Sequence, residues 1–169
     1  MSDFSLRHAL GFDESNLVDV TGCAPHRLTP STVRAWLQLQ QSAEANGFKP
    51  VIVSSYRGFE RQLAIWAGKA MGARPVLDDA DQLVDMASLS PLQKVEAIMR
   101  FSALPGASRH HWGTDFDIAD LSCVGQDYKI QLTVSETRGA MAPFYQWLDS
   151  YLAEAPNQFY RPYAADTGG

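Results

Sequence analysis

Cysteine is scarce in this sequence, with only Cys23 and Cys123 among 169 residues. Zinc ribbons and dithiol redox sites use closely spaced cysteine pairs, and these two positions lie far apart, which argues against both classes. We expect two free thiols. A disulfide between them is the alternative if the chain is exported, because disulfides persist in oxidising compartments.

Long apolar runs and clusters of basic residues are also absent from the sequence. No stretch approaches the roughly 20 apolar residues of a membrane-spanning helix, and residues 1–20 lack the apolar segment of a signal peptide. The formal net charge is −5, with no basic run. This balance argues against nucleic acid or an anionic membrane as the main partner.

The composition itself is that of an ordinary globular protein, with 46% hydrophobic and 20% charged residues. The length suffices for one domain with a core, and the sequence contains no repeat, linker or low-complexity segment. We therefore predict a single domain over residues 1–169, with an irregular N-terminal arm at 1–28.

Periodicity and capping residues predict helices interspersed with short strands. Thr29 suits a helix N-cap, Pro30 the first helical position, and Gly47 the end of that helix. We expect further helices at 57–71, 91–103 and 135–152, a partly helical surface loop at 74–88, and strands at 50–55, 114–119 and 159–163. This pattern indicates the α+β class. The apolar face expected for the helix at 57–71 consists of Phe59, Leu63, Trp66 and Ala67.

Residues 108–118 combine two of the four histidines with two aspartates and a glycine turn. From Thr114 to Ala119 acidic and apolar residues alternate, which is typical of a strand. Imidazole and carboxylate are common zinc ligands, so we interpret His110 and Asp117 as a metal-binding pair. The alternative is a capping or core histidine beside an ion-paired aspartate.

Two neighbours of this pair have competing interpretations. His111 should point away from His110, and we expect it to face solvent. A role facing substrate or supporting the ligands is the alternative. Asp115 should share a strand face with Asp117, where it would either orient a ligand histidine or form part of an acidic surface.

Arg57 follows a predicted strand and stands at the start of a predicted helix. A guanidinium in this position can bind an anion through two hydrogen bonds or stabilise a developing oxyanion. A surface salt bridge is the alternative. Gln62 could reach the same cavity only if Arg57 lies before the helix proper.

Two spaced motifs contain these residues. One is Ser-x-His-x-x-Gly-x-x-x-Asp, and the other is Ser-x-Tyr-Arg-x-x-x-x-Gln. The residues concerned are Ser108, His110, Gly113 and Asp117 in the first motif and Ser54, Tyr56, Arg57 and Gln62 in the second. Over about residues 50–165, the chain resembles the VanY-type D-alanyl-D-alanine carboxypeptidases, which are zinc peptidases of the hedgehog/D,D-peptidase superfamily.

The resemblance implies an α+β fold with a small antiparallel sheet flanked by helices. It implies one zinc ion, held by two histidines and an aspartate, and release of the terminal D-Ala from peptidoglycan stem peptides. His110 and Asp117 would bind the zinc, and Arg57 would stabilise the oxyanion. The substrate-binding residues carried over are Tyr56, Gln62 and Ser108. The substrate class implies the periplasm or cell wall, although these residues include no signal peptide and the cytoplasm stays open.

The sequence departs from the family pattern in two places. Asp115 replaces the usual alanine, and no Glu-x-x-His motif follows His111 to supply the third ligand and the general base. We therefore expect a chain shortened at its C-terminus and inactive in this form. The alternatives are a non-catalytic relative that binds peptidoglycan peptides, a cell-wall endopeptidase of the phage-lysin kind, or an enzyme that uses His8 or His26 as third ligand.

The missing motif should also belong to a strand. Its absence would expose a sheet edge near residues 159–163. Because exposed edges pair readily with other strands, a dimer through this edge is a further expectation.

Overall fold

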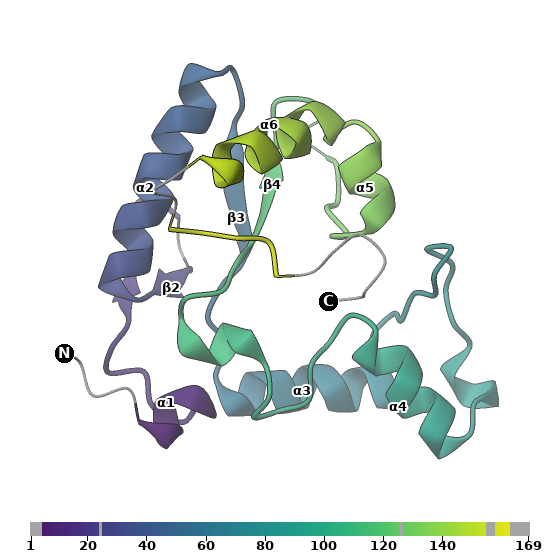
Figure 1. Cartoon of the computed structure of the whole chain (residues 1–169). Helices are drawn as coiled ribbons and strands as arrows, with labels where there is room; N and C mark the ends of the chain where they lie inside the picture. Colours follow the sequence, from purple (N-terminus) through teal and green to yellow (C-terminus); the bar gives the residue numbers. More distant parts are fainter. Residues whose placement is uncertain (1–4, 24, 126, 155–157, 163–169) are drawn as a thin grey trace. The chain divides into compact units, whose positions relative to one another are not determined.

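The computed structural model describes residues 5–23, 25–125, 127–154 and 158–162 (Figure 1). Short helices and strands alternate along the chain. In order, the elements are α1 (Leu6–Ala9), β1 (Val18–Asp19), β2 (Arg27–Leu28), α2 (Pro30–Ala45), β3 (Pro50–Ser54), α3 (Phe59–Ala70), the 3-10 helix η1 (Met86–Ser88), α4 (Pro91–Met99), the 3-10 helix η2 (Arg109–Trp112), β4 (Asp117–Asp120), α5 (Val134–Arg138) and α6 (Ala142–Ala153).

The chain forms two compact units. The described residues of 5–16 and 56–115 make up one, called here the helical unit, and those of 17–55 and 116–162 make up the other, the sheet unit. The expected N-terminal arm therefore contributes to both. Its residues also form short regular elements, α1, β1 and β2, where the sequence indicates only an irregular segment.

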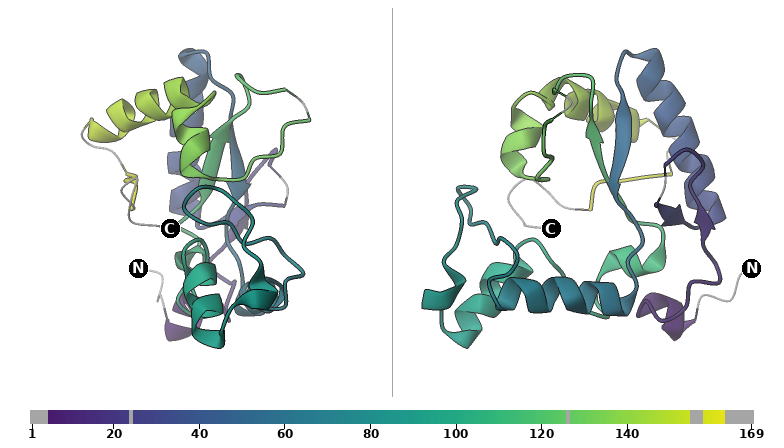
Figure 2. Two further views of the ribbon diagram at one scale, coloured as in Figure 1. Left: turned by 90° about the vertical axis from the view of Figure 1, so that its right-hand side faces the viewer. Right: turned by 180° about the vertical axis from the view of Figure 1, so that it is seen from behind.

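The sheet unit contains the predicted small antiparallel sheet. Strands β3 and β4 run side by side in opposite directions (Figures 1 and 2), with Ile52 opposite Ile118 and Ser54 opposite Asp117. The register is irregular between Ile52 and Ser54. Strands β1 and β2 form a separate antiparallel pair. The fold-class prediction of helices around a small antiparallel sheet is thus confirmed.

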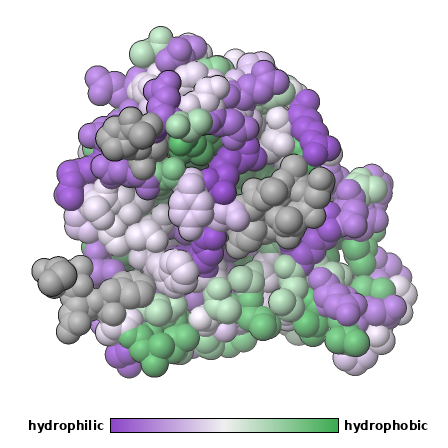
Figure 3. Space-filling view, in the orientation of Figure 1, coloured by the Kyte–Doolittle hydropathy of each residue, from purple (hydrophilic) through white to green (hydrophobic). Residues whose placement is uncertain are grey.

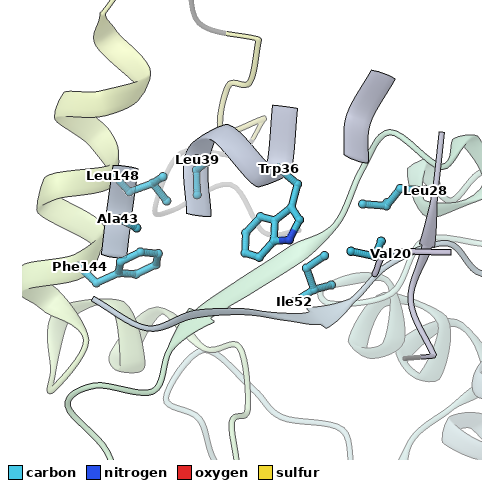
Figure 4. Close-up of a cluster of buried hydrophobic side chains, with 8 residues drawn as sticks. All are labelled: Val20, Leu28, Trp36, Leu39, Ala43, Ile52, Phe144 and Leu148. Carbon is cyan, nitrogen blue, oxygen red and sulfur yellow. The ribbon is translucent and has the colours of Figure 1, made fainter. Parts of the chain in front are cut away.

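Helix α2 carries one side of the hydrophobic core of the sheet unit. It begins as the sequence predicts: the Thr29 hydroxyl accepts a hydrogen bond from the Thr32 N–H, and Pro30 occupies the first turn. Its residue Trp36 is fully buried in this core (Figure 4). Strand β3, helix α6 and the β1–β2 pair complete this core. Its buried members are Val20, Leu28, Trp36, Leu39, Ala43, Ile52, Phe144 and Leu148.

The helical unit is built on α3 and α4. A capping box at Ser90 and Gln93 opens α4, as the Ser-Pro start predicts. The segment between these helices was expected to be a surface loop, but it also packs inward. Val76 and Met86 from this segment and Ile98 from α4 are buried together, with the half-buried Trp66 of α3 against them. This cluster holds the loop onto the two helices.

The predicted apolar face of α3 is wrong in part. Leu63 is 45% exposed, whereas the buried residues of the helix are Gln62 and Gly68. Apolar side chains therefore gather on the outer surface of α3 and α4, seen in green along the lower part of Figure 3. The exposed apolar residues of these two helices and the residue after α3 are Leu63, Met71, Leu92, Val95 and Met99.

Two further predictions about the C-terminal part need correction. The helix expected at 135–152 is two helices, because Gly139 interrupts the helical conformation after α5 and Pro143 opens α6. The strand expected at 159–163 is absent from residues 159–162, and Tyr163 lies outside the described residues. Phe159 instead packs edge-on against Phe116, with ring centroids 5.2 Å apart.

The expected sheet edge is therefore not formed by residues 159–162, and the dimer remains an untested prediction. Cys23 and Cys123 are both free thiols, as expected. Within the described ranges, no helix combines the length and apolar character that crossing a membrane requires.

Candidate active site

Arg57 lies in the helical unit, two residues before α3 begins at Phe59. Both of its main-chain polar groups bind the turn that contains the two adjacent histidines. The Arg57 N–H donates to the His110 carbonyl oxygen at 3.3 Å, and His111 Nδ1 lies 2.5 Å from the Arg57 carbonyl oxygen. Segments that are more than fifty residues apart in the sequence are thereby joined at the arginine.

Gln62 holds the side chain of Arg57. Arg57 Nη1 donates to Gln62 Oε1 at 3.1 Å, and Gln62 Nε2 donates to the Ala103 carbonyl oxygen at 2.7 Å. From the sequence, Gln62 could approach Arg57 only if Arg57 lies before the helix. Arg57 does precede α3, and the two side chains are in contact. Gln62 is fully buried. Its amide therefore acts as a fixed bridge between the guanidinium and the chain after α4.

His110 sits in η2, a short turn that follows the buried Ser108 and ends at Gly113. Gly113 has a φ of +69°, in the left-handed region that favours glycine. His110 Nδ1 lies 3.2 Å from the carbonyl oxygen of Asp115. Donation from Nδ1 to this oxygen leaves the ring lone pair on Nε2, which is the form that a metal ligand requires.

The expectation that Asp115 shares a strand face with Asp117 is wrong. Strand β4 begins only at Asp117, and Asp115 lies before it. Its carboxylate is 3.3 Å from Arg109 Nη2. Asp115 does orient a histidine, but through its main-chain oxygen. The role of its carboxylate is then the ion pair with Arg109.

His111 does not face solvent, and that prediction is also wrong. Its side chain is 1% exposed. The Gly106 N–H donates to His111 Nε2 at 3.0 Å, so Nδ1 carries the ring proton and donates it to the Arg57 carbonyl oxygen. Burial lowers the pKa of His111, which favours the neutral ring.

The two other candidate residues of the helical unit are Tyr56, next to Arg57 in the sequence, and Ser108, two residues before His110. The Ser108 carbonyl oxygen accepts the His111 N–H at 3.1 Å. The Tyr56 hydroxyl donates to the Gly11 carbonyl oxygen at 3.4 Å. The structure thus places Tyr56, Arg57, Gln62, Ser108 and His110 in one unit.

Asp117 belongs to the sheet unit, at the first position of β4. Further along this strand, Asp120 is buried, and its carboxylate accepts the Lys49 N–H at 2.7 Å and the Ser122 N–H at 3.0 Å. Tyr145 donates its hydroxyl to the Ile118 carbonyl oxygen at 2.8 Å. Asp120 and Tyr145 therefore stabilise the strand that carries Asp117.

A catalytic zinc ion needs three protein ligands and a water molecule. His110 and Asp117 are suitable donor types. In the part of the chain that the structure describes, however, no group of three His, Cys, Asp or Glu side chains is arranged to hold a metal ion. His8 Nδ1 is 2.9 Å from the Ser5 hydroxyl, and His26 Nδ1 is 3.0 Å from the Ser55 hydroxyl. The described residues therefore do not form a complete zinc site.

Solved structures define the class of this fold. The chain is similar to VanYB in complex with D-alanine-D-alanine, with a TM-score of 0.55 and 22% identity over 79% of this chain and 59% of that one. It is also similar to the LdcB LD-carboxypeptidase, with a TM-score of 0.56 and 17% identity over 85% and 58% of the two chains. A mutant VanY D,D-pentapeptidase from a VanB-type resistance cassette, in complex with Zn(II), gives a TM-score of 0.54 and 22% identity over 79% and 60%. The fold is that of the hedgehog/D,D-peptidases.

Within this class, sequence similarity identifies the family. Residues 25–168 match the VanY D-alanyl-D-alanine carboxypeptidase family, and the chain belongs to it. A Haemophilus influenzae protein, described as uncharacterized, is 44% identical over 96 residues, which are 56% of this chain and 66% of that protein. The chain thus spans slightly less than two thirds of this relative and 58% to 60% of the solved chains.

Proposed function

We propose that this chain carries the arginine, one histidine and the aspartate of a zinc-dependent D-alanyl-D-alanine carboxypeptidase. Its substrate would be a peptidoglycan stem peptide that ends in D-Ala, and its place of action the periplasm or cell wall. One observation carries the proposal. Arg57 and His110, which come from different motifs, are joined directly by the hydrogen bond from the Arg57 N–H to the His110 carbonyl oxygen.

Arg57 is the proposed catalytic residue. A guanidinium can stabilise the oxyanion that develops when a peptide carbonyl is attacked, provided that it is held in place beforehand. Gln62 supplies this restraint, because its buried amide binds Arg57 at one end and Ala103 at the other. Tyr56 and Ser108 are proposed to line the substrate site. Gln62, which the resemblance also assigns to substrate binding, is fully buried, and we propose that it acts through Arg57.

His110 and Asp117 are the proposed zinc ligands, His110 through Nε2. The chemistry that zinc supplies in peptidases is polarisation of the scissile carbonyl and of a bound water molecule. The 169 residues contain no Glu-x-x-His sequence that would provide the family's third ligand and general base. We therefore propose that these residues by themselves have negligible carboxypeptidase activity.

The test is release of D-Ala from a muramyl pentapeptide in the presence of zinc. Two proteins are compared: the 169-residue chain and the product of the complete coding region. We expect release by a product that includes a Glu-x-x-His motif after Gly169, and loss of that release in Arg57→Ala and His110→Ala variants. Release by the 169 residues alone, abolished by His110→Ala, would overturn the proposed inactivity.

A second candidate function is peptidoglycan-peptide binding without cleavage. It is favoured by the incomplete set of metal-binding side chains among the described residues. Binding of the pentapeptide by the complete product, with no D-Ala released, would support it over the enzyme. Cleavage of a cross-linked muropeptide in place of the terminal D-Ala would instead indicate an endopeptidase.

A further inference from the structure

Three segments of the helical unit meet at the buried ring of His111. The Gly106 N–H binds one ring nitrogen, and the Arg57 carbonyl oxygen binds the other. The third segment is the N-terminal turn at Gly11. Gly11 in turn accepts the Phe59 N–H on its carbonyl oxygen at 2.9 Å, which secures this turn over the start of α3.

Gly11 is shaped to accommodate the imidazole. A Cβ atom at this position would lie 2.6 Å from His111 Nδ1 and 2.8 Å from the Phe59 nitrogen, both far too close. Gly11 also has a φ of +77°, which disfavours any side chain. The turn can therefore pack directly onto His111 only because residue 11 is glycine.

Arg57 needs partners for its main chain because it lies outside any helix or strand. Buried or half-buried main-chain groups without partners are costly, so they are almost always satisfied. The N–H of Arg57 is satisfied by the carbonyl oxygen of His110. The carbonyl oxygen of Arg57 needs a donor as well, and the ring N–H of His111 supplies it.

From this geometry we propose that His111 is a positioning residue, which fixes the backbone of Arg57 against the turn that carries His110. Gln62 fixes the guanidinium of the same arginine. Arg57 is thus held at its side chain and at its main chain by two different buried groups. The inference rests on the proposed function of Arg57, whose guanidinium can also bind an anion such as the terminal carboxylate of a D-Ala-terminated peptide.

The first arm of the test does not depend on any activity. Nitrogen-15 spectra of the histidine side chains of the whole 169-residue chain would assign the tautomer of His111. We expect a neutral ring protonated at Nδ1. A neutral ring protonated at Nε2, or a ring that exchanges freely between both tautomers, would overturn the inference.

The second arm separates the two hydrogen bonds of the ring. In a His111→Asn variant, the amide NH₂ can still reach the Arg57 carbonyl oxygen. In His111→Gln the longer side chain can still accept the Gly106 N–H, while His111→Leu retains neither bond. The readout is the affinity for N-acetyl-D-Ala-D-Ala, measured by calorimetry on variants whose folding is checked by circular dichroism.

We expect His111→Leu and His111→Gln to weaken peptide binding by about three- to tenfold, the effect of one lost hydrogen bond. His111→Asn should restore most of the affinity. In an Arg57→Ala background, His111→Leu should have no further effect, because His111 acts through Arg57. Ile98→Val, which changes a buried residue of the cluster that Ile98 forms with Val76 and Met86, should leave the affinity unchanged.

Equal losses in all three His111 variants, or an undiminished effect of His111→Leu in the Arg57→Ala background, would overturn the positioning role. If the unsubstituted chain fails to bind the peptide, the proposed peptide site fails. The tautomer of His111, and the shift of the Gly58 amide resonance when the bond to the Arg57 carbonyl is removed, would then still decide whether His111 holds Arg57.

Discussion

At the scale of single residues, two adjacent histidines have different surroundings. His110 is partly exposed, with Nδ1 near a main-chain oxygen, which suits a ligand that uses Nε2. His111 is buried and binds main-chain groups at both ring nitrogens. The tight 3-10 turn turns consecutive side chains in different directions, so one of the two histidines points inward.

Replacing Gln62 by leucine should destabilise the fold. The change removes the bonds to Arg57 and to Ala103 in a position with no access to water. We expect a loss of about 1–3 kcal/mol in the free energy of unfolding, measured by urea denaturation. The control is Gln41→Leu on the exposed face of α2, which should change it by less than about 0.5 kcal/mol. Equal effects of the two substitutions would contradict a structural role for the Gln62 amide.

Tyr145 should make the fold sensitive to alkaline pH. Burial raises its pKa from the usual 10.0 to about 12. Since the folded pKa lies above the unfolded one, the stability from the neutral hydroxyl is complete below pH 10 and is lost as the pH rises from 10.0 towards about 12. Urea denaturation across this range should show a steeper alkaline loss for the wild type than for Tyr145→Phe. Parallel curves for the two proteins would exclude this contribution.

At the scale of elements, the polar inner face of α3 accounts for the exposure of some of its apolar residues. Gln62, Trp66 and Lys69 recur on one face of the helix and all bind the chain that follows α4. Trp66 Nε1 donates to the Ala103 carbonyl oxygen at 2.8 Å, and Lys69 Nζ donates to the Ser102 hydroxyl at 2.7 Å. The inner face of α3 must therefore supply hydrogen-bond donors, and several apolar residues are left on the outer surface.

The turn after α1 should tolerate no side chain at Gly11. Gly11→Ala combines an unfavourable positive φ with a clash against His111 and Phe59. Gly72→Ala is the matched control in the same unit, because Gly72 has a φ of +73° but nothing within 4 Å of its Cβ position. We expect about 1–2 kcal/mol of destabilisation for Gly72→Ala from the backbone alone, and about 1–3 kcal/mol more for Gly11→Ala.

Urea denaturation of the two glycine variants would measure this difference. Equal losses would mean that the turn moves away from His111 without cost. That result would contradict the requirement for glycine at position 11 in packing onto His111. It would not bear on the hydrogen bonds of the His111 ring.

At the scale of the whole molecule, the candidate residues are distributed over both units. Arg57 and His110 lie in the helical unit, and Asp117 lies in the sheet unit. The chain passes from one unit to the other between residues 55 and 56, next to Arg57, and again between residues 115 and 116, next to Asp117. The two motifs on which the resemblance was based thus include or adjoin the points where the chain changes units.

The 169-residue chain should bind zinc only weakly, because the proposed ligands His110 and Asp117 would supply only two of the three protein ligands that a catalytic zinc requires. Calorimetric titration of the metal-free chain with zinc would measure this. His110→Ala should abolish the remaining weak binding, and a variant at the free Cys123, Cys123→Ser, should leave it unchanged. A sub-micromolar dissociation constant for the unsubstituted chain would show that a third ligand is present after all.

Much of the fold could be predicted from short stretches of sequence. The start of α2 at Thr29 and Pro30, the capping box of α4 at Ser90, and strand β3 all agree with the structure. The family was also recognisable from two spaced motifs in the sequence, and the family match over residues 25–168 confirms it. These features depend on hydrogen bonds and steric preferences within a few residues, which the local sequence contains in full.

The tertiary structure decided which side chains are buried. Phe159 packs on Phe116 where a strand was expected, and α3 turns Gln62 inward instead of Leu63. His111 is enclosed because Gly11, Arg57 and Gly106 come together around it. Burial depends on segments that are distant in the sequence, so the local pattern could identify the histidine pair but not which of the two rings is buried.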